Sequence, residues 1–220
     1  DRCYLVTFRK VDPLFVIDLK DPSSPKVLGQ LKITGYSDYL HPYDENHILG
    51  VGKETVEAQE GDFAWYQGVK ISLFDVSDVE EPKEIAKYEI GDRGTDSPIL
   101  SDHKALLFDK SKKLLVIPVL VAEINEEQYS EGVPPNAYGD YVWQGAYVFS
   151  ISLNEGLMFR GRITHIEDAT DLMKNDYYFS YPYFVKRSLY IDNVLYTISD
   201  KKIKMNSLEN LDEINEVEFS

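Results

Sequence analysis

The sequence is short of cysteine, of basic residues and of long apolar runs, and each shortage excludes a class of protein. Its single cysteine, Cys3, excludes a framework of internal disulfides. Lys and Arg number 23 against 38 Asp and Glu, which gives a formal net charge of −15 and none of the basic surface that nucleic acids require. No run approaches the roughly 18 consecutive apolar residues of a membrane span. We therefore expect no nucleic-acid partner and no membrane span in this chain.

Several motifs of known chemistry are missing as well. The chain contains no glycine-rich phosphate loop and no HExxH, GxSxG or CxxC motif. The stretch DVSD at 75–78 lacks the glycine and the terminal glutamate of an EF-hand loop. We predict no catalytic residue and no bound cofactor, and Ca²⁺ is the one cofactor that the acidic composition leaves open.

What the sequence does contain is a repeated phrase. A short apolar run carrying an Asp, Ser or Asn, followed by a turn and an alternating segment, occurs four times. The copies are FVIDL at 15–19, LFDVS at 73–77, VFSIS at 148–152 and KMNSL at 204–208. A hydrophobic content of 43% with 16 tyrosines fits a folded, strand-rich protein. Repeats of roughly 55–75 residues that are built only of strands are typical of β-propeller blades.

The repeat also shows which strand of each blade a given segment forms. If A is the innermost and D the outermost of four antiparallel strands, each copy supplies strand C, the turn and the start of strand D. The predicted fold class is all-β: a β-propeller fragment of about three complete four-stranded blades plus a partial blade with strands B, C and D at the N-terminus. We predict one partial propeller domain, 1–220, with blades near 1–34, 35–91, 92–163 and 164–220. The missing innermost strand predicts closure by sequence outside this chain, or self-association through the incomplete edge.

Two further predictions concern local structure. The A strand of the third blade is expected at 103–108 and that of the fourth blade at 184–191, by their β-branched and aromatic residues. A short helix is expected at 168–175, where Asp168 can cap the run that follows it.

Three long connections are expected on one face of the propeller. Antiparallel strands place the B–C and D–A connections on the same face, and the long ones at 53–68, 122–145 and 164–183 belong to these two classes. They are rich in carboxylates and aromatic rings, which suit stacking on sugars or on cationic side chains. The candidate binding residues are Trp65, Asp140, Tyr141 and Trp143. The alternative is that these rings pack the connections against one another.

A second candidate site is the entrance of the central channel. Aligning the A strands by the aspartates of their turns places polar residues near the start of each strand, beneath the long connections. The candidates are Asp38, Asp102, His103, Lys104 and Arg187. The acidic residues and the histidine suit a bound cation or acid–base chemistry, and the two basic residues suit an anion. The alternative is that all of them form ion pairs and hydrogen bonds between neighbouring blades.

Six stretches of the chain resemble a known family. They are RCYLVTF at 2–8, DPLFVIDL at 12–19, YLHP at 39–42, SLFDVSD at 72–78, DHKA at 102–105 and KRSLYI at 186–191. Together they resemble secreted prokaryotic proteins with a C-terminal β-propeller domain, which are distantly similar to WD40 proteins. The resemblance implies an extracytoplasmic location and a larger parent protein, with any signal or anchor outside this fragment. It implies no catalytic residues.

The sequence therefore predicts a non-catalytic binding domain whose acidic, aromatic face takes a protein or glycan partner at the cell envelope. One alternative is a hydrolase that acts on a glycan through carboxylates at the channel mouth, and another is an architectural protein of the cell surface. The hydrolase requires two carboxylates roughly 5–10 Å apart over a cleft. The residues that could supply them are Asp38, Asp96, Asp102 and Asp140.

Overall fold

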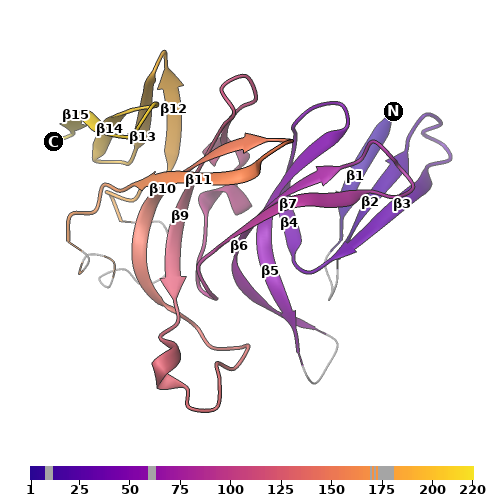
Figure 1. Ribbon diagram of the computed structural model, residues 1–220, viewed down its shortest axis with the longest axis horizontal. Coiled ribbons are helices and arrows are strands. Elements are labelled where there is room, and N and C mark those ends of the chain that lie inside the picture. The colour runs from indigo at the N-terminus through magenta and orange to yellow at the C-terminus, as the bar shows by residue number, and fades with distance from the viewer. Residues whose placement is uncertain (8–11, 59–62, 169, 171, 173–180) are drawn as a thin grey trace. The chain divides into compact units, whose positions relative to one another are not determined.

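A computed structural model describes residues 1–7, 12–58, 63–168, 170, 172 and 181–220, and in these ranges the chain is built of antiparallel sheets (Figure 1). The first sheet has three strands, β1 (Arg2–Val6), β2 (Asp12–Asp18) and β3 (Lys26–Ile33). The second has β4 (Tyr36–Pro42), β5 (His47–Glu57), β6 (Ala64–Asp75) and β7 (Lys83–Ile90). The third has β8 (Leu107–Asp109), β9 (Leu114–Glu123), β10 (Asp140–Ser152) and β11 (Gly156–Ile163). The fourth has β12 (Arg187–Ile191), β13 (Val194–Ile198), β14 (Lys202–Ser207) and β15 (Glu213–Glu218).

This architecture confirms the predicted fold class. Within every sheet the strands neighbour one another in chain order, and the sheet with only three strands is the first. It holds the predicted B, C and D strands. Short 3₁₀ helices in the described part of the chain include η1 (Pro98–Leu100), η2 (His103–Ala105) and η3 (Glu126–Gln128).

The chain divides into two compact units. Unit 1 comprises residues 1–93 together with 125–137, and unit 2 comprises residues 94–124 and 138–220. Unit 1 thus holds the first two sheets and a segment that lies between β9 and β10 in the sequence. Unit 2 holds the third and fourth sheets.

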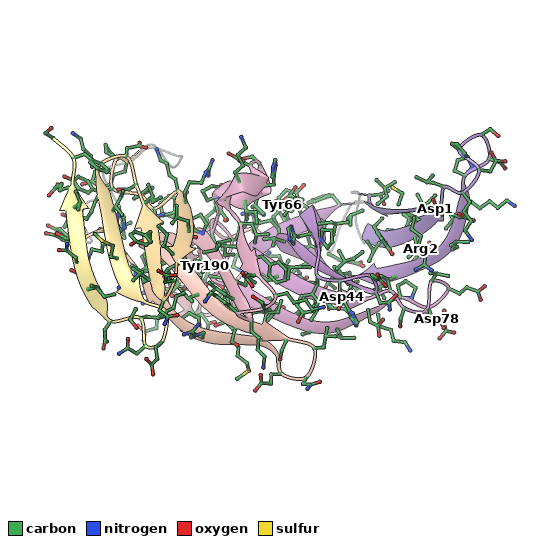
Figure 2. All side chains as sticks on the ribbon, turned by 90° about the horizontal axis from the view of Figure 1, so that it is seen from above. Asp1, Arg2, Asp44, Tyr66, Asp78 and Tyr190 are labelled. Carbon is green, nitrogen blue, oxygen red and sulfur yellow. The ribbon has the colours of Figure 1, made fainter. Side chains whose placement is uncertain are left out.

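Unit 1 has an apolar core between its two sheets. Leu14 of β2 packs there with Ile48 of β5 and with Phe74 at the end of β6. The aspartates of the repeated phrase set the turns, as expected: Asp18 Oδ1 accepts from Lys20 N at 2.9 Å, and Asp75 Oδ1 accepts from Ser77 N at 2.9 Å. Figure 2 shows Asp44 and Asp78 at turns of the second sheet, on the side of unit 1 away from Tyr66, as A–B and C–D turns require.

Unit 2 has a corresponding core. Leu114, Val116 and Val148 of the third sheet pack with Leu195 of the fourth. Strand β9 is buried along nearly its whole length, which explains why its sequence is continuously apolar and does not alternate. Gln144 of β10 joins the third sheet to the segment just before β12, because its side chain donates to Val185 O at 2.9 Å and accepts from Val185 N at 2.9 Å.

The predicted A strand of the third blade is wrong in its first half. Residues 103–105 form η2, and the strand β8 begins only at Leu107. Asp102 caps this turn, since its Oδ1 accepts from Lys104 N at 3.0 Å and its carbonyl accepts from Ala105 N at 3.0 Å. In the fourth blade β12 begins at Arg187, three residues later than expected. The helix predicted at 168–175 lies largely outside the described residues.

The predicted connection at 53–68 is in large part strand, and the one at 122–145 is strand at its two ends. Strands β5 and β6 continue to Glu57 and from Ala64, and β9 and β10 continue to Glu123 and from Asp140. The pairing of Val56 with Trp65 shows the cause, because β-branched and aromatic cross-strand pairs stabilise an extended hairpin. Trp65, Asp140, Tyr141 and Trp143 therefore lie on strands, which hold them more rigidly than loops would.

Candidate binding site

The first wall of the candidate site is an extension of the second sheet. Residues 53–58 and 63–68, which we call the arm, continue the β5–β6 hairpin after a bulge at Lys53 and Thr55. Three pairs extend it: Thr55 with Tyr66, Val56 with Trp65, and Glu57 with Ala64. Beyond them Ala58 N donates to Phe63 O at 3.1 Å. The arm thus presents Phe63 and Trp65 from a paired backbone.

The second wall is the segment 125–137, which we call the flap segment. Asn125 begins it as a cap, with its side chain accepting from Glu127 N at 3.1 Å. Further main-chain bonds hold the rest, including Tyr129 N to Glu126 O at 3.0 Å and Ala137 N to Pro134 O at 2.9 Å. The segment thus begins with η3 and continues through short turns and two prolines.

Gln67 joins the two walls. Its Nε2 donates to Trp65 O at 3.3 Å within the arm and to Pro135 O at 3.0 Å in the flap segment. Both walls belong to unit 1. The flap segment is therefore bonded to the arm by a defined contact.

Between the walls lies an open hollow of about 950 Å³. Its lining combines aromatic rings and prolines with amide, hydroxyl and carboxylate side chains. Its lining comprises Ala58, Phe63, Trp65, Gln128, Tyr129, Ser130, Glu131, Gly132, Val133, Pro134, Pro135 and Asn136. A concave surface of this size with a few polar groups is characteristic of a ligand site.

Trp65 has partners inside unit 1 that hold its ring in place. Phe63 meets it edge to face, with the ring centroids 4.9 Å apart and the planes at 81°. The guanidinium carbon of Arg93 lies 5.0 Å from the Trp65 ring centroid. Arg93 Nη1 also donates to Tyr66 O at 3.1 Å, which fixes the guanidinium to the arm.

The candidate residues of the channel mouth are only partly brought together. Asp102 and Arg187 form an ion pair in unit 2, and both are half-buried. The main-chain N–H of Lys104 and the charge of Arg187 lower the pKa of Asp102 below its usual range. A hollow of about 370 Å³ lies beside the pair, lined also by Lys186 and Asp200, which form a second ion pair.

The other channel-mouth candidates are placed separately. His103 and Lys104 lie on η2 with exposed side chains and not at the strand positions that the alignment predicted. Asp38 is exposed on β4 and belongs to unit 1, whereas the other four belong to unit 2. Of the channel-mouth candidates, Asp102 and Arg187 are therefore the two that form an ion pair with each other.

The remaining candidates on β10 are largely committed to packing within unit 2. Trp143 lies with its ring centroid 4.7 Å from the guanidinium carbon of Arg162 and 5.2 Å from the ring of Tyr147. Tyr141 packs against the buried Leu120 and its neighbours. Asp140 is exposed at the start of β10, opposite Glu123. Of the two tryptophans, Trp65 is the one that lines the hollow.

The sequence reasoning missed two buried lysines. Lys70 of β6 donates to Thr34 O at 2.6 Å and lies 3.2 Å from Glu84 Oε1. Lys202 of β14 lies 2.9 Å from Glu167 Oε1 and 3.2 Å from Glu216 Oε2. A lysine on a strand whose neighbouring strand carries glutamates is the signal that the sequence offers, with Glu84 on β7 and Glu216 on β15. Both lysines join neighbouring elements by ion pairs.

His165 is a third buried polar group that the sequence did not single out. Its Nδ1 lies 3.1 Å from Ser199 Oγ and its Nε2 lies 2.9 Å from Thr197 Oγ1. Burial of the imidazole lowers its pKa from 6.5 to about 4, so the ring is neutral at neutral pH. Ser199 Oγ already donates to Lys202 O at 3.1 Å, so it accepts from Nδ1 and the Thr197 hydroxyl donates to Nε2.

Two findings bear on metals and membranes. Within the described residues, no three side chains of His, Cys, Asp or Glu converge in a way that could hold a metal ion. In the same part of the chain, none of the helices has the length and apolar character needed to cross a membrane.

Antiparallel sheets of three or four strands that follow one another in chain order are the architecture of β-propeller blades. A family model described as "Beta propeller domain" matches residues 1–211, and the chain therefore belongs to this family.

Two curated proteins are similar to the chain. An uncharacterized protein of Methanocaldococcus jannaschii is 33% identical over 219 residues, which cover 100% of this chain and 27% of that protein. An uncharacterized protein of Archaeoglobus fulgidus is 45% identical over 115 residues, which cover 52% of this chain and 16% of that protein. The chain thus spans only about a quarter or less of the length of these relatives.

Proposed function

We propose that this chain is a non-catalytic binding domain and that the hollow between the arm and the flap segment is its ligand site. The observation that carries the proposal is the joint lining of a 950 Å³ hollow by Trp65 and Phe63 from one wall and by residues 128–136 from the other. Ligand sites combine aromatic surface with a few placed polar groups, and this hollow has both.

A binding role is favoured over hydrolysis by the state of the channel mouth. A glycan hydrolase needs one carboxyl group that keeps its proton near neutral pH. The pKa of Asp102 is shifted the other way, by the Lys104 N–H and by Arg187. An ion pair that joins η2 to β12 accounts for these residues without a reaction.

An extracytoplasmic site of action is part of the same proposal. It rests on the resemblance of the chain to secreted proteins and on an acidic surface that suits partners at the cell envelope. The test is the fractionation of cells that express the full-length protein with an epitope tag. Recovery of the tag outside the cytoplasm is expected, and recovery in the cytoplasm alone would overturn this part.

The binding proposal is tested with material from the cell envelope. Immobilised wild type, Trp65→Ala and Tyr138→Ala are exposed to solubilised envelope glycans and envelope proteins of the native cells, and bound mass is recorded by interferometry. Tyr138 is the matched control, since it is aromatic, 61% exposed and outside the lining of the hollow. Loss of binding in Trp65→Ala alone supports the proposal. Equal binding by all three proteins removes the hollow from consideration.

Self-association through the first sheet is a second proposal for a partner. Among the described strands, β1 is paired only with β2, and a strand at the edge of a sheet can pair with a strand of a second copy. Light scattering over a range of concentrations tests this, and a monomer mass throughout would contradict it.

A further inference from the structure

We propose that the hollow of unit 1 takes a short stretch of a neutral oligosaccharide, with one sugar ring stacked on Trp65. This inference rests on the proposed function, since it names the ligand of the same site. It is carried by the partners of Trp65 and by the chemistry of the side chains around it.

The Trp65 ring already has a cation. Arg93 lies 5.0 Å from its centroid and is held there by the bond to Tyr66 O at 3.1 Å. A second cation over the same ring would meet the repulsion of the first, because the attraction of a cation to an aromatic face is electrostatic. The C–H groups of a neutral sugar carry no such charge. The contact between Arg93 and Trp65 therefore disfavours a cationic ligand at this ring, whereas a neutral ligand is not repelled.

An anionic ligand is disfavoured by the surrounding charge. Glu131 lines the hollow, and Glu126 and Glu127 are exposed on η3 in the same flap segment. The chain as a whole carries a net charge of −15. Like charges brought together at a binding surface oppose association, so sugar acids and phosphorylated ligands are unsuitable.

The polar side chains of the hollow match hydroxyl groups. Gln128 and Asn136 each offer an amide donor and an amide acceptor, and Ser130 offers a hydroxyl. Glu131 adds a carboxylate acceptor. A sugar ring presents an apolar face and a rim of hydroxyls that both donate and accept. Aromatic rings beside amides and a carboxylate satisfy both parts of such a ligand.

The walls are organised before a ligand arrives. The arm is a paired hairpin, and Gln67 bonds it to Pro135 at 3.0 Å. Phe63 holds the Trp65 ring edge to face at 4.9 Å. A site whose aromatic surface is already ordered loses little conformational entropy on binding, which is important for weakly binding neutral sugars.

The experiment compares neutral, cationic and anionic ligands of similar length. Chitotetraose is neutral, and its fully deacetylated counterpart has the same backbone with amines in place of the acetamides. These two, cellotetraose, mannotetraose, a tetragalacturonate and a proline-rich decapeptide are titrated into the wild type by calorimetry. The same titrations are made on Trp65→Ala, Trp65→Phe and Tyr138→Ala, with thermal unfolding as a check that each variant is folded.

We expect at least one neutral tetrasaccharide to bind the wild type, with affinity reduced about tenfold or more in Trp65→Ala. Trp65→Phe should retain binding within about fivefold, since a smaller ring still stacks, and Tyr138→Ala should bind as the wild type does. Binding of only the deacetylated tetramer, only the tetragalacturonate or only the peptide would overturn the inference while leaving the proposed function in place. Failure of every neutral sugar would also overturn it, whereas loss of envelope binding by the wild type would remove the proposed function itself.

Discussion

Gln67 Nε2 donates to Pro135 O at 3.0 Å, across 68 positions of the sequence. This bond ties the flap segment to the arm, and it is half-buried beside the hollow. The segment 125–137 thereby forms part of unit 1, although it lies between two strands of unit 2 in the sequence. A single amide side chain thus links the backbone that presents Trp65 to the segment that completes the lining.

Replacing Gln67 by alanine should loosen the flap segment. The bond to a main-chain carbonyl contributes about 0.5–1.5 kcal/mol, so global unfolding should change by no more than this amount. Hydrogen exchange of residues 125–137 should rise well above that of the strands, because local opening loses its main restraint. Gln30→Ala, at an exposed position of β3, is the matched control. Unchanged exchange in the Gln67 variant would show that Gln67 does not restrain the segment.

The two tryptophans should differ in their effect on stability. Trp143 packs on Tyr147 and Arg162, and a Cβ added at Gly145 would lie 2.6 Å from its ring. Trp143→Ala should therefore lower the free energy of unfolding by about 2–4 kcal/mol, since it leaves a hole over the sheet. The measurement is urea denaturation, with Tyr138→Ala as the exposed aromatic control. A change below that of the control would mean that the Trp143 ring does not pack as described.

His165 should make stability depend on pH. Burial, with the charges of Lys204 and Lys202 nearby, lowers its pKa from 6.5 to about 4, against the smaller opposing effects of Glu213 and the Thr197 main chain. Between these two values the unfolded chain holds more protons than the folded chain. The free energy of unfolding therefore falls as the pH is lowered through this window, by about 1–3 kcal/mol from this group.

The measurement is a comparison of wild type with His165→Gln by denaturant unfolding from about pH 7 to about pH 4. The wild type should lose its advantage over the variant as the pH falls, because glutamine does not titrate. A difference between the wild type and His165→Gln that stays constant over this range would contradict the burial of a neutral imidazole.

Two glutamates of β15 should contribute unequally to the free energy of unfolding. Glu216 lies 3.2 Å from Lys202, whose side chain is only 2% exposed, whereas Glu213 lies 2.9 Å from the more accessible Lys204. Glu216→Gln should lower the free energy of unfolding by about 1–3 kcal/mol, since a buried ammonium loses part of its compensation. Glu213→Gln should change it by less than about 1 kcal/mol. Equal changes in calorimetric unfolding would mean that Lys202 is not held as a buried charge.

The pair Asp102–Arg187 should act as a modest structural contact. A double-mutant cycle with Asp102→Asn and Arg187→Gln should give a small favourable coupling, because both side chains are half-exposed and screened by solvent. The cycle is measured by urea denaturation at low salt and at high salt. The coupling should shrink at high salt, and a coupling that does not respond to salt would contradict an ion pair.

Much of the fold followed from local pattern. The repeated phrase predicted strands C and D in each blade, and the aspartates at 18 and 75 form the expected turn contacts. One predicted strand was wrong in its first half. Residues 103–105 were expected in a strand, but Asp102 caps a 3₁₀ turn there, and a local side-chain bond to the main chain outweighs the weaker preference for an extended backbone.

The site was harder to predict than the fold. Trp65 and Trp143 have the same chemistry and both were candidates. Each ring has an arginine over it and an aromatic neighbour, and they differ in that Trp65 also lines the hollow of unit 1. No pattern along the chain encodes such contacts.

The sequence alone determined that this chain is all-β, acidic and built from repeated four-stranded units, because strand periodicity and turn chemistry are local properties. The tertiary structure decided which of the aromatic residues could meet a ligand. It did so through Gln67 and Pro135, which are distant along the chain and bonded in space, so that the flap segment becomes the second wall of the hollow. Contacts of this kind arise when the folded backbone brings separate segments together, and residue order along the chain does not reveal them.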